Sequence, residues 1–269
     1  MMSSKECFSH ELVKIVIPVY KTDLNVYETI SLNQAVHVFK DYTKIIIKPA
    51  SLDIKVILGK YENQFDVQDF DDDYFVDLVG YNSLMLSPEF YKRFLDSKYI
   101  LIYQLDAFVF RDELTYWCSF NYDYIGAPWL CKQKYQQGQW MRLFLKIRGR
   151  IYSILKIKHR QQCFYKVGNG GFSLRKTDSC YRITISKQKL IRHYLRHVQK
   201  SSQYNEDVFW GIEAMKDDNF FVPSWSEALR FSFDLFPEVC FRLSGHNLPF
   251  GCHRWNKELN FWSKYIPVD

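Results

Sequence analysis

Short apolar runs alternate with a longer segment of mixed polarity in the first part of the chain. Residues 14–20 and 44–48 are β-branched runs bounded by polar residues, a pattern typical of buried strands. Between them, residues 28–39 repeat apolar side chains at helical spacing. This alternation of strand and helix predicts an α/β domain with a mainly parallel sheet.

The pattern resumes after a weaker stretch over residues 59–77. Ser87 followed by Pro88 is typical of a helix start, which predicts a helix to about residue 96. Residues 98–105 predict a buried strand that ends at Asp106, and residues 163–175 predict two strands around a glycine-rich turn. Further helices are expected over residues 112–118 and 190–199. Because no repeat or linker interrupts this order, we expect a single domain over residues 1–269.

Residues 139–160 predict a basic amphipathic helical insertion. One stripe of the helix carries Trp140, Phe144, Ile147, Ile151 and Leu155. Basic residues without any acidic residue occupy the same stretch, namely Arg142, Lys146, Arg148, Arg150, Lys156, Lys158 and Arg160. Such a segment can lie on the anionic inner face of a membrane. The alternative is a helix packed on the sheet with its basic face in solvent.

Composition narrows the class of protein. Of 269 residues, 47% are apolar and 25% are charged, with 11 Gly and 8 Pro, which is typical of a soluble globular protein and excludes a disordered one. No window is long and apolar enough to span a bilayer, and no signal peptide is apparent, so we expect a cytoplasmic protein. Seven scattered Cys without a CxxC pair predict reduced thiols. The net charge of +6 is mild, and no nucleic-acid-binding motif accompanies it.

Two motifs lie at the ends of predicted strands. Asp106 ends a strongly apolar strand, where open α/β sheets bind ligands, although it can also simply cap the next turn. Residues 168–173 contain three glycines in four residues, which indicates either a close approach of a ligand to the backbone or a hairpin turn.

Two further motifs carry ionisable groups. Asn205 is a candidate N-cap that places Glu206 and Asp207 in a first helical turn, either as ordinary helix starters or as a general base with a neighbour that orients substrate. His253 and Arg254 follow a glycine, and they can bind a metal or a phosphate or be structural. We interpret residues 71–73, three consecutive Asp, as a solvated loop or helix cap.

The order of these motifs resembles the layout of GT-A glycosyltransferases. The phrases YQLDAFVF, YDYIGAPW, VGNGGFSLR, NEDVFW and PFGCHRW are similar to those of an uncharacterised bacterial glycosyltransferase-like family found among surface-polysaccharide genes. The resemblance covers about residues 14–255. It implies a GT-A-like (Rossmann-like) domain with a mixed, mainly parallel central sheet flanked by helices.

The resemblance also implies a function. It predicts transfer of a sugar from a nucleotide-sugar donor, most readily a UDP-sugar, to a hydroxyl of a glycan or lipid-linked glycan in bacterial surface-polysaccharide biosynthesis. It assigns the base of an inverting enzyme to Asp207, with Glu206 second, the divalent metal to Asp106 and His253, and an acceptor sugar to Trp129. The donor-binding residues that it implies are Pro18, Val19, Tyr20, Asn82, Asp106, Gly170, Gly171 and Arg254, with Asp53 as a weaker candidate.

One departure from the family pattern leaves alternatives open. GT-A enzymes usually carry Asp-x-Asp, whereas here Asp106 is followed by Ala107 and Phe108. Either Mn²⁺ or Mg²⁺ binds through Asp106, His253 and the diphosphate, or cations such as Lys166, Arg175 or Arg254 neutralise the leaving group. The departure also favours a non-catalytic carbohydrate- or nucleotide-binding protein on a transferase fold. A nucleotidyltransferase is disfavoured because residues 19–23 contain no phosphate-binding loop.

Overall fold

The computed structural model of the protein describes residues 12–61, 63–131, 139–154 and 160–268, and the structural statements below concern these residues. A six-stranded sheet has the order β3-β2-β1-β4-β9-β6. In that order the strands are Asp66–Phe70, Lys44–Pro49, Val13–Pro18, Tyr99–Tyr103, Phe172–Lys176 and Tyr124–Ile125. Strands β3, β2, β1 and β4 run parallel, whereas β9 is antiparallel to both β4 and β6. The predicted mixed, mainly parallel central sheet is confirmed.

Burial explains which strands the apolar pattern predicted. β1, β2 and β4 lie inside the sheet, and nearly all of their side chains are buried, so their sequences are apolar almost throughout. β3 is an edge strand in which only Phe70 is buried. Its sequence, Asp-Val-Gln-Asp-Phe, therefore carries little strand signal, and the pattern did not predict it.

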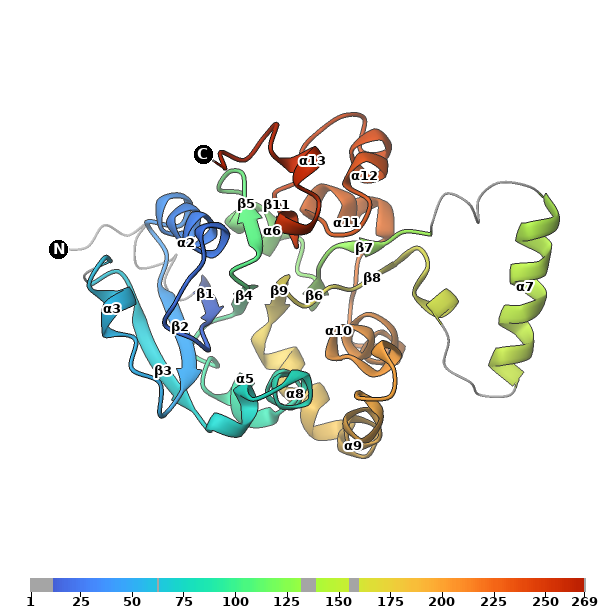
Figure 1. Ribbon diagram of the computed structural model, residues 1–269. Coiled ribbons are helices and arrows are strands. Elements are labelled where there is room, and N and C mark those ends of the chain that lie inside the picture. Colours follow the sequence, from blue (N-terminus) through green and yellow to red (C-terminus); the bar gives the residue numbers. More distant parts are fainter. Residues whose placement is uncertain (1–11, 62, 132–138, 155–159, 269) are drawn as a thin grey trace.

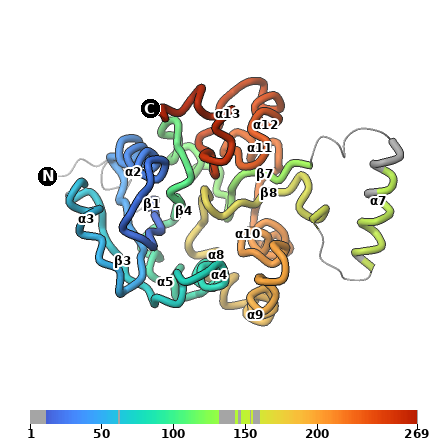
Figure 2. The backbone as a smooth tube through the Cα atoms, in the orientation of Figure 1, coloured from blue at the N-terminus to red at the C-terminus, as the bar shows by residue number. Residues whose placement is uncertain are grey.

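Helices cover both faces of the sheet (Figures 1 and 2). α2 (Val26–Val38) lies on one face, and α5 (Pro88–Lys92) and α8 (Thr177–Ser186) lie on the other. α2 begins two residues before the predicted start because Asn25 and Glu28 form a reciprocal capping box. α5 begins after the predicted cap at Ser87, but it ends at Lys92 rather than near residue 96.

Shorter elements complete the fold. The remaining helical elements are α3 (Lys55–Leu58), η1 (Asp72–Phe75), α4 (Leu78–Met85), α6 (Leu114–Ser119), η3 (Arg160–Cys163), α9 (Gln188–His197), η4 (Ser202–Tyr204), α10 (Glu206–Val208), the π-helical turn η5 (Phe209–Glu213), η6 (Ala214–Lys216), α11 (Trp225–Phe231), α12 (Pro237–Leu243), η7 (Trp255–Lys257) and α13 (Leu259–Trp262). β10 (Ser232–Phe233), β11 (Gly251–His253) and β5 (Ala107–Val109) form one small sheet, and β7 (Pro128–Trp129) and β8 (Lys166–Val167) form another.

The C-terminal segment is anchored beside the end of β4. β11 runs antiparallel to β5, with His253 opposite Ala107. A buried aromatic cluster that includes Trp255 and Trp262 holds the segment there. Because Ala107 directly follows Asp106, this pairing brings His253 next to Asp106, although the two are far apart in the sequence.

Helix α7 (Gln139–Ile154) lies apart from the sheet, beyond β7 and β8 (Figure 1). The alternative of a helix packed on the sheet is therefore wrong. Leu155, Lys156 and Lys158, which were expected to extend this helix, lie outside the described residues. Within the described residues, no helix combines the length and the apolar character needed to cross a membrane.

Candidate active site

A pocket of about 350 Å³ lies beyond the carboxyl end of β4. Its walls come from the turn between β8 and β9, the start of α10 and the end of β11. Of the residues singled out in the sequence, it takes in Asn82, Trp129, Gly170, Gly171, Glu206, Asp207, His253 and Arg254. Asp106 contacts this wall through His253, since its Oδ1 lies 3.0 Å from His253 Nε2.

The glycine-rich turn connects two different sheets and is not a hairpin. β8 pairs with β7, whereas β9 pairs with β4 and β6. A Cβ atom at Gly170 would lie 1.7 Å from Glu206 Oε1, and one at Gly171 would lie 2.1 Å from His253 Nε2. These glycines are therefore required because two ionisable side chains pack directly on the backbone.

Helix α4 holds the acidic start of α10. Asn82 Oδ1 accepts a hydrogen bond from the backbone N–H of Glu206. The expected side-chain cap from Asn205 is not formed, although Asn205 has the extended backbone of an N-cap. Asn82, predicted to bind the donor, is 1% exposed and uses its amide oxygen for this internal bond.

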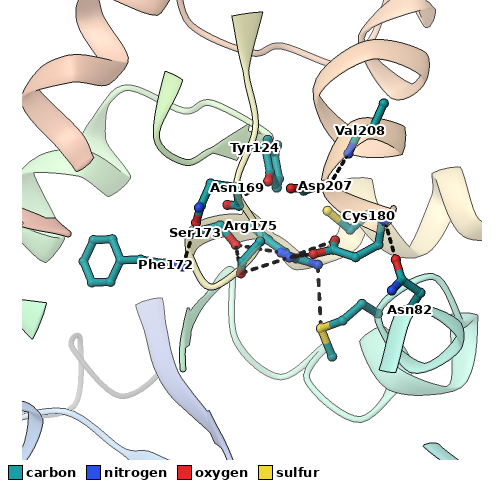
Figure 3. A network of polar contacts seen from close by, with 12 residues as sticks. Asn82, Tyr124, Asn169, Phe172, Ser173, Arg175, Cys180, Asp207 and Val208 are labelled. Carbon is teal, nitrogen blue, oxygen red and sulfur yellow. Dashed lines mark hydrogen bonds and ion pairs between the residues drawn. The ribbon is translucent and has the colours of Figure 1, made fainter. Parts of the chain in front are cut away.

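Arg175 and Glu206 form an ion pair under the pocket. Figure 3 shows Arg175 within the network of polar contacts that surrounds it. Arg175 Nη2 lies 3.1 Å from Glu206 Oε2, and the two side chains are 0% and 6% exposed. Arg175 also donates hydrogen bonds to Ser173 Oγ, Gly170 O and the Tyr91 hydroxyl. The guanidinium is therefore enclosed, and the alternative in which Arg175 neutralises a leaving diphosphate is wrong.

Asp207 lies at the pocket wall and is only partly buried. Its Oδ1 accepts a hydrogen bond from the Val208 backbone N–H at 2.8 Å. Burial against the pocket wall, together with the charge of the neighbouring Glu206 carboxylate, raises the pKa of Asp207 to about 7. A carboxylate that faces a pocket and titrates near neutral pH is suited to act as a general base.

His253 lies between two carboxylates. Its Nε2 faces Asp106, and its Nδ1 lies 3.4 Å from Asp234 Oδ1. Burial disfavours a charged imidazole, but Asp106 and Asp234 outweigh burial and raise the pKa of His253 to about 10. Burial would likewise raise the pKa of Asp106, but His253 more than offsets this and lowers it.

The same residues would hold a divalent cation only after His253 loses a proton, because a protonated imidazole nitrogen has no lone pair for a metal. Asp106 Oδ1 lies 3.0 Å from His253 Nε2, which is an ordinary ion-pair distance, and carboxylate oxygens are ligands that Mg²⁺ and Mn²⁺ prefer. Gln104 Oε1 lies 3.2 Å from the same nitrogen. Asp234 and the Asn169 amide contact the opposite nitrogen and fix the ring, as outer partners of metal-binding histidines do. In the described residues, no three His, Cys, Asp or Glu side chains converge on one point.

The predicted nucleotide-binding strand end lies outside this pocket. Pro18 and Val19 are buried, Tyr20 is 59% exposed, and none of the three lines the pocket. Because β1 and β4 are parallel neighbours, Tyr20 and Asp106, which follow them, lie at the same edge of the sheet. Asp53 lines a different hollow, at the end of β2.

The other predicted side chains lie at the rim or on the surface. Trp129 lines the pocket, with its ring on the backbone of Gly168. Arg254 is exposed at the pocket and has a left-handed backbone with φ of 55°. Lys166 is exposed and does not line the pocket. Asp71 accepts a hydrogen bond from the Asp73 N–H and caps η1, as one interpretation of the acidic run predicted.

The residues of the site that the sequence analysis did not identify include Gln104 and Asp234, which contact or flank His253. Gln104 is a polar residue at the very end of an apolar strand, which is the signal that could have found it. Asp234 follows the two-residue strand β10, which has no recognisable pattern. Only the pairing of β10 with β11 places it beside His253.

Comparison with known proteins gives one family and several similar structures. A model of the family described as "Protein of unknown function (DUF5672)" matches residues 64–253. No curated protein matches the chain.

Among solved structures, the chain is similar to the glycosyltransferase GlyE of Streptococcus pneumoniae TIGR4, with a TM-score of 0.53 and 14% identity over 97% of this chain and 61% of that chain. An active-site mutant of LgtC has a TM-score of 0.52 and 13% identity, over 89% and 86% of the two chains. TarS of S. aureus has a TM-score of 0.32 and 16% identity over 44% of this chain, which spans 35% of that chain. The likeness to GlyE and LgtC shows a GT-A-like fold.

Proposed function

The chain belongs to the DUF5672 family, and we propose that it is a glycosyltransferase that moves a sugar from a nucleotide-sugar donor to an acceptor hydroxyl. One observation carries the proposal. Asp207, whose pKa is raised to about 7, lines the same pocket as His253, and His253 in turn contacts Asp106. Sugar transfer requires a base that takes the proton of the acceptor hydroxyl, and it requires stabilisation of the negative charge that develops on the leaving diphosphate.

Asp207 is the proposed general base. An acceptor hydroxyl is a poor nucleophile near pH 7, and a positioned carboxylate that takes its proton in the transition state contributes about 10²–10⁴-fold. Glu206 is not equivalent, because its carboxylate is held by Arg175. Its proposed role is to position α10 and to raise the pKa of its neighbour. Direct attack assisted by one base corresponds to inversion at the sugar carbon.

Positive charge near the leaving diphosphate is the second requirement. Asp106 and His253, with Gln104 beside them, are the residues that would hold Mn²⁺ or Mg²⁺. When bound, such an ion supplies charge stabilisation to the diphosphate. Arg254 is exposed at the pocket and supplies a cation of the protein's own.

The remaining assignments complete the proposal. The strand end formed by Pro18, Val19 and Tyr20 binds the nucleotide, for which uridine is our first choice. Trp129 offers an aromatic face to the acceptor sugar. We propose a glycan or lipid-linked glycan acceptor and a place in bacterial surface-polysaccharide synthesis in the cytoplasm, on the strength of the motif resemblance.

Two observations favour a second candidate, a non-catalytic binding protein. The second carboxylate of Asp-x-Asp is absent, and both nitrogens of His253 already have partners. A protein of this kind would bind nucleotide or sugar without turnover.

The test is release of nucleoside diphosphate from a panel of nucleotide sugars, with Mn²⁺ and a mixture of simple glycosides as acceptors. We expect the wild type to turn over at least one donor, and we expect Asp207→Asn to lose about 10²–10⁴-fold in kcat with donor affinity retained. The control Asp218→Asn removes an exposed carboxylate that does not line the pocket and should be active. Binding without turnover across the panel would select the second candidate, and full activity of Asp207→Asn would remove Asp207 from its role.

A further inference from the structure

Helix α7 presents an apolar face to solvent. Leu143, Phe144, Ile147, Ile151 and Ile154 are between 48% and 79% exposed. Residues three, four and seven positions apart share one face of a helix, so these five side chains form a single row, which we call the α7 stripe. Isolated exposed apolar residues are ordinary, but a contiguous row marks an interaction surface.

Basic residues occur in the same helix as this row. Helix α7 contains Arg142, Lys146, Arg148 and Arg150 and no acidic residue. The Arg148 guanidinium lies 5.6 Å from the centre of the Phe144 ring, and Arg150 is exposed. With 100° per residue, Arg148 and Arg150 fall on opposite flanks of the α7 stripe. An apolar row with positive charge on both sides matches an anionic lipid surface, where acyl chains lie beneath phosphates.

The helix is connected to the pocket through η3. Arg148 Nε donates a hydrogen bond to Gln161 Oε1 at 3.2 Å. The neighbouring η3 residues Arg160 and Cys163 line the pocket. Figure 1 shows α7 on the outer side of β7 and β8, where no part of the sheet covers it. A surface that binds α7 would therefore lie next to one wall of the pocket.

We propose that α7 docks the protein on an anionic lipid bilayer, with the α7 stripe at the boundary of headgroups and acyl chains and its arginines at the phosphates. The inference does not depend on sugar transfer, because it rests on the exposure and charge of α7 alone. The absence of acidic residues from the helix favours lipid over a second copy of the chain, whose own charge is mixed. If the proposed function holds, docking would bring the pocket to lipid-linked acceptors.

The experiment is flotation of the full chain with vesicles of phosphatidylcholine, with or without 30% phosphatidylglycerol. We expect binding to the anionic vesicles only, and weakening with added salt. Arg148→Gln with Arg150→Gln should weaken binding by roughly 30-fold, since each basic side chain near such a surface contributes roughly fivefold. Phe144→Ser with Ile147→Ser and Ile151→Ser should abolish it.

The matched control neutralises two exposed arginines elsewhere. Arg192→Gln with Arg196→Gln on α9 removes the same charge and should bind like the wild type. Thermal melting checks that each variant is folded. Equal binding to neutral and anionic vesicles, or equal losses in the α7 and α9 charge variants, would overturn the proposal. Self-association that the serine variant abolishes, without any flotation, would assign the α7 stripe to a second copy instead.

Discussion

At the scale of single residues, the neighbouring carboxylates of Glu206 and Asp207 have different surroundings. Glu206 is buried and neutralised by Arg175, whereas Asp207 faces the pocket and has no cationic partner among the interactions described for it. Adjacent positions therefore hold one acid that is enclosed in an ion pair and one that is accessible from the pocket. Different surroundings of this kind can separate the pKa values of two neighbouring carboxyl groups.

The raised pKa of Asp207 predicts how stability changes with pH. The folded protein holds this proton up to about pH 7, whereas the unfolded chain releases it near pH 4, so folding loses stability as pH rises between these values. At pH 5 the protonated side chain resembles an amide, and Asp207→Asn should change the free energy of unfolding little. At pH 8 the variant should be more stable by about 1 kcal/mol or more. Urea unfolding at both pH values measures this, and a variant less stable at pH 8 would contradict it.

The buried ion pair predicts a non-additive pair of substitutions. Glu206→Gln alone leaves Arg175 without its counter-charge, and Arg175→Met alone leaves Glu206 without one, so each should cost about 3–5 kcal/mol. The double variant removes both charges and should recover much of the loss. Denaturant unfolding of the four proteins gives the coupling energy. Additive losses would show that the pair does not act as a unit.

At the scale of elements, the turn between β8 and β9 explains what the sequence could and could not predict. Its glycines and the acidic helix start were recognised from composition alone, because glycine clusters and acidic caps have local signatures. Their partners were not, since Gly171 and Glu206 meet His253 and Arg175 only after β11 and β9 take their places in the sheets. Local sequence patterns therefore identified candidate residues, whereas the pairing of distant strands determines which side chains these residues contact.

The packing of this turn predicts the effect of one methyl group. Gly171→Ala would place a Cβ 2.1 Å from His253 Nε2 and 2.6 Å from Gln104 Oε1, so both side chains must move. We expect a loss of about 1–3 kcal/mol in stability, together with loss of sugar transfer. Gly149→Ala is the matched control, since its nearest neighbour is 4.0 Å away. Thermal melting and the donor-release assay test both variants, and wild-type behaviour of Gly171→Ala would contradict the packing argument.

At the scale of the whole molecule, the sheet was predictable and the site was only partly so. Central strands such as β1 and β4 are buried on both faces, so their sequences are continuous apolar runs that predict a strand. The edge strand β3 and the two-residue strand β10 have no such apolar run and were not predicted. Because Asp234 directly follows β10, it was not predicted either. The sequence also left the position of α7 open, because an amphipathic helix is compatible with packing on a sheet or on another surface.

A ligand that binds across this fold should stabilise the whole chain. If the strand end at Tyr20, the Asp106–His253 pair and the pocket form one donor site, a nucleoside diphosphate with Mn²⁺ at about 100 times its Kd should stabilise the folded state by about 2.7 kcal/mol. For a chain of this size we expect the melting temperature to rise by roughly 5 °C or more. Asp207→Asn should keep this shift, because the base is not needed for donor binding, whereas Asp106→Asn should lose the increment that Mn²⁺ adds. Differential scanning fluorimetry of the three proteins, with nucleotide alone and with metal, separates these contributions. A shift that Mn²⁺ does not change in any of them would assign the diphosphate to Arg254 and the other cations of the pocket.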